Sequence, residues 1–220
     1  MCEESVFMRE NKVELLGFYG SDEIHACSAW TSTNREMTGE KLLRIPKLLK
    51  MLADNGHHTP FEKSSLHFLV TSDIASHIHK LKHRIGVSIN GESARYKELK
   101  EDKYYIPNDW PEDWKAKLKT HTEEGIKLYH ECLVSLISRD YSQSIDKKRA
   151  KESARYFRGY NTQIDCDIMF NWRSFNHFLS LRNKPEAQLE IHEIATKMLQ
   201  LVKDIPESPF QHTISAFGLA

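Results

Sequence analysis

The chain has 220 residues, of which 40% are hydrophobic and 28% are charged, and its formal net charge is zero. This balance argues against a strongly basic nucleic-acid binder, and no apolar run approaches the ~20 residues needed to cross a bilayer. The N-terminus is polar and the 4 cysteines form no Cys-x-x-Cys pair, so we expect a cytoplasmic protein with free thiols, no metal site, no nucleic-acid partner and no membrane association.

The sequence up to Gly56 predicts one strand and two helices. Val13 and Leu15 indicate an opening strand, and Ser21 or Asp22 then caps a helix that runs through positions 26 and 29. The second helix carries an apolar stripe over positions 42–52. It is interrupted or restarted at Pro46 and ends at Gly56.

Positions 65–91 predict a strand, a helix and a loop. Leu66, Phe68 and Val70 alternate with polar residues at 65, 67 and 71, which is typical of a half-buried strand. Asp73 or Ser72 caps the helix that follows, Gly86 ends it, and residues 85–91 form a polar loop. The residues expected to face the core from this helix are Ile74, Ile78 and Leu81.

The second half of the chain predicts long helices. A loop at 104–111 leads into a helix from about 114 to 138, whose buried side includes Leu128 and Leu133. Asn183, Pro185 and Glu186 are interpreted as the N-cap, first-turn proline and capping-box residue of a final helix. Its core stripe is Ile191, Ile194, Met198 and Leu201. Without repeats or a linker, residues 1–220 are expected to form one domain.

Basic and polar groups concentrate between positions 82 and 96. Lys82-His83-Arg84 is followed, after eight residues, by Ser93-Ala94-Arg95-Tyr96. Hydroxyls, backbone N–H groups and a planar guanidinium suit a phosphate. The same residues also fit a basic helix end followed by a solvated surface loop, and on local pattern alone both interpretations stay open.

Three blocks of the sequence together resemble the flavin-dependent thymidylate synthase family. The first block is residues 57–62, the second is 82–96, and the third runs from Arg155 through Asn171-Trp172-Arg173-Ser174 to 182 and on to 191. That family has Arg-His-Arg, a seven-residue spacer and a Ser. This chain has Lys82 as the first member, one additional spacer residue, Gly91 where Glu is usual, and Phe157-Arg158-Gly159 in place of Leu-Pro.

The resemblance implies an α+β subunit with a small sheet and several long helices, assembled into a homotetramer with shared active sites. It implies that FAD is reduced by NADPH, that methylenetetrahydrofolate supplies a one-carbon unit, and that dUMP becomes dTMP. One alternative is a related flavoenzyme that modifies UMP or dCMP. Another is a non-enzymatic binder of nucleotides or single strands that uses the basic, His-rich patch.

The resemblance also implies roles for individual residues. Arg182 and His57 are the catalytic candidates, with Arg182 on the uracil ring and His57 on the folate-facing side of the flavin. Outside the resemblance, Arg182 would be only a cation that stabilises a helix C-terminus. The flavin would contact His57, Thr59, Lys82, His83, Arg84, Asn171, Arg173 and His177. The nucleotide would contact His79, Gly91, Glu92, Ser93, Ala94, Arg95, Arg155 and Arg182.

Overall fold

The computed structural model describes residues 10–93, 95–99, 101–138 and 144–220, and these divide into two compact units. Each unit combines separate stretches of the sequence, so neither is a contiguous piece of chain. That the whole chain forms one domain stays a prediction. Unit 1 comprises Met1–Lys12, Thr71–Ile78 and Gly91–Cys166, and unit 2 comprises Val13–Val70, His79–Asn90 and Asp167–Ala220.

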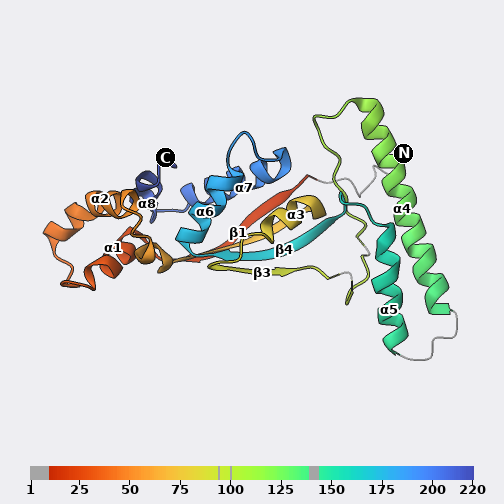
Figure 1. Cartoon of the computed structure of the whole chain (residues 1–220), viewed down its shortest axis with the longest axis horizontal. Helices are drawn as coiled ribbons and strands as arrows, with labels where there is room; N and C mark the ends of the chain where they lie inside the picture. The colour runs from red at the N-terminus through yellow and green to blue at the C-terminus, as the bar shows by residue number, and fades with distance from the viewer. Residues whose placement is uncertain (1–9, 94, 100, 139–143) are drawn as a thin grey trace. The chain divides into compact units, whose positions relative to one another are not determined.

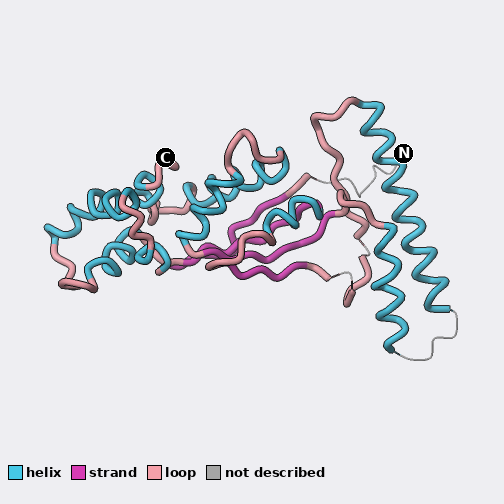
Figure 2. Tube along the Cα trace, in the orientation of Figure 1, coloured by secondary structure: helices cyan, strands magenta, loops and turns pink. Residues whose placement is uncertain are grey.

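Four strands lie side by side in the order β1-β2-β4-β3 (Figures 1 and 2). They are β1 (Lys12–Tyr19), β2 (Ser65–Asp73), β3 (Val87–Gly91) and β4 (Gln163–Phe170). Thr71 bonds Asp165, whereas the earlier residue His67 bonds the later residue Asp167, so β2 and β4 are antiparallel. A small antiparallel sheet with many helices confirms the predicted α+β class.

The strand predicted over 65–71 is confirmed as β2, in which Leu66, Phe68 and Val70 are fully buried. The predicted opening strand is confirmed as β1. The loop predicted over 85–91 is wrong, because Val87–Gly91 forms the edge strand β3. Val87 and Ile89 alternate with polar residues, a signal of strand that was too short to separate from a loop.

Unit 2 contains most of the helices. Ser21 caps the first one as predicted, since its side chain accepts from the Ile24 N–H at 3.3 Å. The interruption predicted at Pro46 is wrong, because α2 continues through this proline. The helix packs against α8 (Figure 1). The helices are α1 (Asp22–Trp30), α2 (Gly39–Asp54), α6 (Trp172–Arg182), α7 (Leu189–Lys203), α8 (Gln211–Ala216) and the 3₁₀ helix η1 (Thr59–Glu62).

The N-cap predicted for the last long helix is also wrong. Helix α7 begins at Leu189 after Gln188, and no side chain caps it. Asn183 instead ends α6, and its Oδ1 accepts from the Thr196 hydroxyl at 2.8 Å. Most of the predicted core stripe of α7 is buried, but Val202 rather than Leu201 completes it. No helix in the described ranges is both long and apolar enough to span a bilayer.

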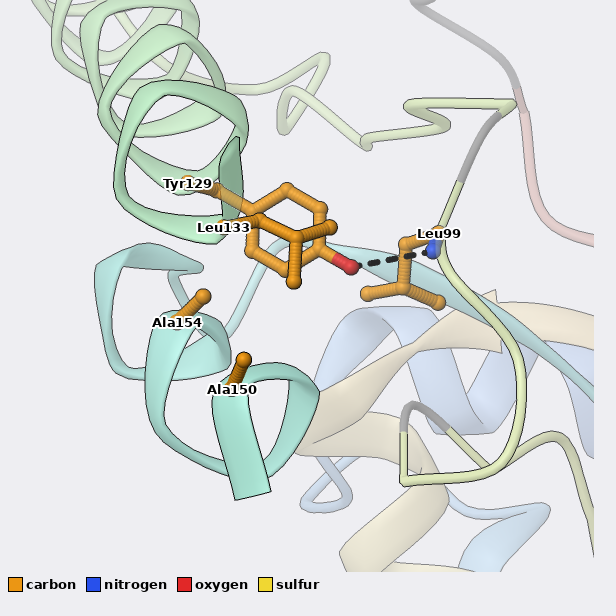
Figure 3. Packing of buried hydrophobic residues seen from close by; sticks show 5 residues of the cluster. All are labelled: Leu99, Tyr129, Leu133, Ala150 and Ala154. Atoms are coloured by element: carbon orange, nitrogen blue, oxygen red, sulfur yellow. Dashed lines mark hydrogen bonds between the residues drawn. The ribbon is translucent and has the colours of Figure 1, made fainter. Parts of the chain in front are cut away.

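Unit 1 contains α4 (Glu112–Ser138), α5 (Ser144–Ala154) and the short η2 (Arg155–Phe157), and α3 (Ile74–Lys80) begins in it. The helix predicted from about 114 to 138 is confirmed as α4. Leu133 is buried as predicted, but Leu128 is exposed and its neighbour Tyr129 is buried instead. The Tyr129 hydroxyl accepts from the Leu99 N–H at 3.2 Å. Figure 3 shows Tyr129 and Leu133 facing Ala150 and Ala154 of α5.

Helix α3 presents a different face to the interior from the predicted one. Asp73 caps it as predicted, because its carboxylate accepts from the Ser76 N–H at 2.8 Å. Ile78 and Leu81, however, are 38% and 44% exposed, whereas Ser76 and Lys80 are fully buried. The reason is that the first turn is fixed by backbone bonds from residues 74 and 75 to the carbonyls of residues 162 and 160, which set the helix rotation.

A buried chain of polar side chains crosses unit 2. His25 is fully buried, with Nε2 at 2.9 Å from the Ser64 hydroxyl and Nδ1 at 3.0 Å from the Thr213 hydroxyl. Thr213 donates its own proton to Asp22, so it must accept from His25 Nδ1–H. Asp22 also accepts from the backbone N–H groups of His212 and Thr213 at 2.7 and 2.8 Å, which caps the start of α8.

We predict that His25 makes the stability of the fold depend on pH. Burial lowers the pKa of His25 from 6.5 to about 4. The unfolded chain therefore binds more protons than the folded one between these values. The free energy of unfolding should be highest above pH 6.5 and fall as the pH decreases towards 4, by on the order of 3 kcal/mol from this group. Urea unfolding across this range measures the effect.

The control for this prediction is His25→Gln, which keeps a donor and an acceptor but does not titrate. Its unfolding free energy should vary less with pH than that of the parent, whereas the exposed His121→Gln variant should keep the parent slope. The buried His83 titrates in the same direction, so part of the slope should remain in His25→Gln. An unchanged slope in His25→Gln would refute the assignment.

A second prediction concerns Gly125 in the middle of α4. Replacing an exposed helical glycine by alanine normally stabilises a protein by up to about 1 kcal/mol. A Cβ at Gly125 would lie only 2.5 Å from the Phe157 carbonyl oxygen, so Gly125→Ala should instead destabilise by roughly 1–3 kcal/mol. Gly39→Ala in α2, where nothing lies within 4 Å of the new Cβ, is the matched control. If both variants gained stability on urea unfolding, close packing at Gly125 would be disproved.

Candidate functional site

A cavity of about 320 Å³ lies beside the start of α6 in unit 2, and we call it the α6 cavity. Asn171 caps this helix, because its Oδ1 accepts from the Ser174 N–H at 2.8 Å. Arg173 follows and forms an ion pair with Glu62 of η1. The residues that line the cavity are His58, Glu62, Ile85, Asn171, Arg173, Ser174, Asn176, His177 and Ser180.

Gly86 holds the segment after α3 against the α6 cavity. Its carbonyl accepts from the Asn171 N–H at 3.2 Å and from the Ser174 hydroxyl at 2.7 Å. Its φ is +67°, and a Cβ would lie 2.5 Å from Asn171 Nδ2, so both backbone conformation and space require glycine here. This junction leaves Ile85 at the cavity and keeps Lys82 and Arg84 exposed.

His83 lies buried behind this surface, at 6% exposure. Arg182 Nε–H donates to His83 Nε2 at 3.2 Å. The His83 ring meets Phe178 edge-on at 5.0 Å and His177 at 5.7 Å. Burial, together with the charges of Arg182, His177 and His79, lowers the pKa of His83 to about 4. Its imidazole is therefore neutral near pH 7.

A second cavity, of about 400 Å³, lies within unit 1 and is called the Ser93 cavity. The end of β3 and the residues after it bring Gly91, Glu92 and Ser93 to it, and η2 brings Arg155. A Cβ on Gly91 would lie 3.1 Å from His77 Cε1, so glycine allows His77 to lie against the strand. The other lining residues are Ile74, His77, Leu99, Arg158 and Ile164.

Cations surround the carboxylate of Glu92. Its oxygens accept from Lys97 Nζ at 3.2 Å and from the Asp165 N–H at 3.3 Å. Lys103, only 6% exposed, lies 2.9 Å from the Asp165 carboxylate and 3.9 Å from Glu92. Although burial lowers it, the pKa of Lys103 is raised above its ordinary value by these carboxylates. Glu92 thus offers hydrogen-bond acceptor oxygens at the cavity.

Arg158 is a cavity residue that the sequence interpretation missed. Its side chain is 3% exposed, Nη1 bonds Asp102 Oδ1, and the guanidinium lies 5.6 Å from the Tyr129 ring centroid. Asp102 is held in turn by His130 Nε2 at 2.9 Å. The sequence signal for Arg158 is its spacing of three residues from Arg155.

The structure brings together some of the predicted site residues and not others. Asn171, Arg173 and His177 share the α6 cavity, with His58 rather than His57 beside them. Four of the predicted residues share the Ser93 cavity, namely Gly91, Glu92, Ser93 and Arg155. The exposed residues that line neither cavity are His57, Thr59, Lys82, Arg84 and Arg95.

The remaining predicted residues contact other partners. Arg95 pairs with Glu152 and lowers the pKa of that carboxyl, and Arg182 bonds His83. His79 Nε2 lies 3.1 Å from Gln188 Oε1. Ala94 lies outside the described residues. Over the described part of the chain, no group of three or more His, Cys, Asp or Glu side chains is arranged to hold a metal ion.

Known proteins resemble this chain over most of its length. Residues 14–207 match the family described as thymidylate synthase complementing protein. The flavin-dependent thymidylate synthase of Pseudothermotoga lettingae is 32% identical over 200 residues, which cover 88% of this chain and 85% of that protein. The flavin-dependent thymidylate synthase of Kosmotoga olearia is 28% identical over 199 residues, which cover 87% of this chain and 84% of that one.

The fold agrees with this relationship. The crystal structure of the UMP/dUMP methylase PolB from Streptomyces cacaoi, bound with 5-Br dUMP, superimposes with a TM-score of 0.79 and 26% sequence identity. The superposition covers 96% of this chain and 97% of that one. These relatives are enzymes, and the match spans both cavities. This chain belongs to the thymidylate synthase complementing protein family, an enzyme family.

Proposed function

We propose that this protein is a flavin-dependent thymidylate synthase that methylates dUMP to dTMP, with FAD as cofactor and NADPH and methylenetetrahydrofolate as co-substrates. The observation that carries the proposal is the Ser93 cavity, where a hydroxyl and the guanidinium-bearing residues Arg155 and Arg158 line one space. A nucleoside monophosphate is dianionic, and guanidinium groups bind phosphate oxygens in a bidentate manner. The names of the family's members support the same chemistry.

The polar residues proposed to bind the nucleotide suit different parts of it. Ser93 and Arg155 would hold the phosphate. Glu92 offers only carboxyl acceptor oxygens, which suit a sugar hydroxyl or a ring N–H rather than a phosphate. Arg95 would have to leave Glu152 before it could reach a phosphate. Arg182 does not line this cavity, and in the proposed homotetramer it would donate to the uracil ring from another copy of the chain and stabilise charge that develops on the ring.

The α6 cavity suits part of a flavin dinucleotide. Its lining offers the Arg173 guanidinium, the amides of Asn171 and Asn176, and two hydroxyls, a donor set that matches pyrophosphate and ribityl oxygens. FAD, when bound, would supply the redox chemistry of the reaction. At about 320 Å³ the cavity is at the lower end of the range for drug-sized ligands, and FAD is larger. This supports a homotetramer in which other copies complete the site.

Gly91 favours one second candidate, a methylase that also accepts UMP. The family usually has a glutamate at this position, and here a residue without a side chain lines the Ser93 cavity. The similar Streptomyces cacaoi protein is described as a UMP/dUMP methylase. A pocket whose carboxylate comes from Glu92, one residue further along the chain, has room for a different arrangement of sugar hydroxyls. We therefore propose UMP as the competing substrate.

The experiment that tests the function is a spectrum of the purified protein followed by turnover assays. We expect flavin absorbance, either as purified or after addition of FAD, and methylation of dUMP in the presence of NADPH and methylenetetrahydrofolate. A panel of dUMP, UMP and dCMP then ranks the substrates. If the protein binds no FAD under any condition, the proposed enzyme class is wrong and a plain nucleotide binder becomes the explanation.

The phosphate role of the Ser93 cavity generates a separate prediction. Ser93→Ala and Arg155→Ala should each weaken dUMP binding by about tenfold to a hundredfold, because a charge-assisted hydrogen bond contributes roughly 1.5–3 kcal/mol. FAD affinity should be unchanged, since FAD is assigned to the other cavity. Isothermal titration with each ligand measures both affinities.

The matched control is Arg149→Ala, which removes an arginine that lies 3.7 Å from Glu152 but does not line the cavity. Arg95→Ala should have a smaller effect than Arg155→Ala, because Arg95 is already paired with Glu152. Equal losses of dUMP and FAD affinity would point to a folding defect. Unchanged dUMP affinity in Arg155→Ala would remove the phosphate assignment.

A further inference from the structure

His83 is buried, unlike its neighbours in the basic segment Lys82-His83-Arg84. Its neighbours in the segment, Lys82 and Arg84, are exposed, whereas His83 is 6% exposed and lines neither cavity. It instead lies against α6, where it touches Phe178 and accepts from Arg182. Its ring therefore lies where it can act on Arg182.

The hydrogen bond to Arg182 fixes the protonation state of the imidazole. A guanidinium N–H only donates, so His83 Nε2 must be the unprotonated nitrogen and Nδ1 must carry the proton. The titratable groups that face the ring are His79 of α3 and His177 and Arg182 of α6. None of them is an acid, so the surroundings disfavour a second proton on His83.

We infer that His83 is a positioning residue for Arg182. This inference rests on the proposed function, in which Arg182 donates to the uracil ring. The bond to His83 uses Nε of Arg182, and neither terminal nitrogen of the guanidinium bonds another described residue. His83 thus orients the guanidinium through Nε and leaves the two terminal nitrogens to bond the pyrimidine.

The advantage of this arrangement is preorganisation. A long arginine side chain has many rotamers, and freezing them during the reaction would raise the barrier. A buried acceptor that holds Nε limits these rotamers before the nucleotide arrives. An arginine tied to a carboxylate would also be ordered, but a neutral imidazole leaves its positive charge available to the ring.

The first test detects the hydrogen bond through the His83 tautomer and requires no enzymatic turnover. Nitrogen NMR of ¹⁵N-histidine-labelled protein should show His83 with a protonated Nδ1 and a bare Nε2 throughout pH ~6 to ~8. In Arg182→Met, which removes the donor and keeps an unbranched side chain, the ring should lose this fixed tautomer. A wild-type His83 with its proton on Nε2, or one that gains a second proton near pH 7, would overturn the inference.

The second test separates positioning from flavin binding. His83→Gln keeps an acceptor near Nε2, whereas His83→Phe keeps a ring without one. We expect kcat of His83→Phe to fall by up to about a hundredfold, with FAD and dUMP affinities changed by less than about threefold, and His83→Gln to recover most of the rate. Equal losses in both variants, or a loss of FAD affinity that parallels kcat, would contradict the inference. Absence of any flavin binding or turnover would refute the proposed function alone, because the NMR result does not depend on it.

Discussion

The interaction on which the candidate flavin site depends is the contact of Gly86 with the start of α6. One carbonyl accepts two hydrogen bonds, from the Asn171 N–H and the Ser174 hydroxyl, while Asn171 itself caps the helix. The missing side chain of Gly86 allows this close approach. Because the junction fixes both the basic segment and the helix, it also determines that His83 lies within reach of Arg182, at the other end of α6.

The elements that could be predicted from the sequence are those with an unambiguous local signal. Strand β2 has Leu66, Phe68 and Val70 at every second position, and α4 has a long helical pattern. Ser21 and Asp73 are short polar side chains placed directly before helices. Strand β3 could not be predicted, since an edge strand of five residues owes its hydrogen bonds to a partner distant in the sequence. The true start of α7 was missed because a plausible cap at Asn183 serves the preceding helix instead.

The candidate site also has parts that the sequence predicts and parts that depend on distant partners. The motifs identified which stretches of sequence supply polar groups, and the structure gathers Ser93 with Arg155 and Asn171 with Arg173 accordingly. They could not identify which member of each stretch faces a cavity. Whether Arg95 or Arg158 lines the Ser93 cavity depends on acidic partners, Glu152 and Asp102, that the motifs do not contain. A local sequence pattern therefore does not determine which side chains pair with residues that are distant in the sequence.

The polar chain through His25 has a consequence for how unit 2 folds. His25 and Asp22 of α1 bond Thr213 of α8 across separations of 188 and 191 residues. Contacts of such long range form only after the ends of a long loop meet by diffusion, and the entropic cost of that closure precedes any gain from the bonds. The capping of α8 by a side chain of α1 thus makes its final docking a high-contact-order event. The speed of this step is set by topology more than by the strength of the bonds it forms.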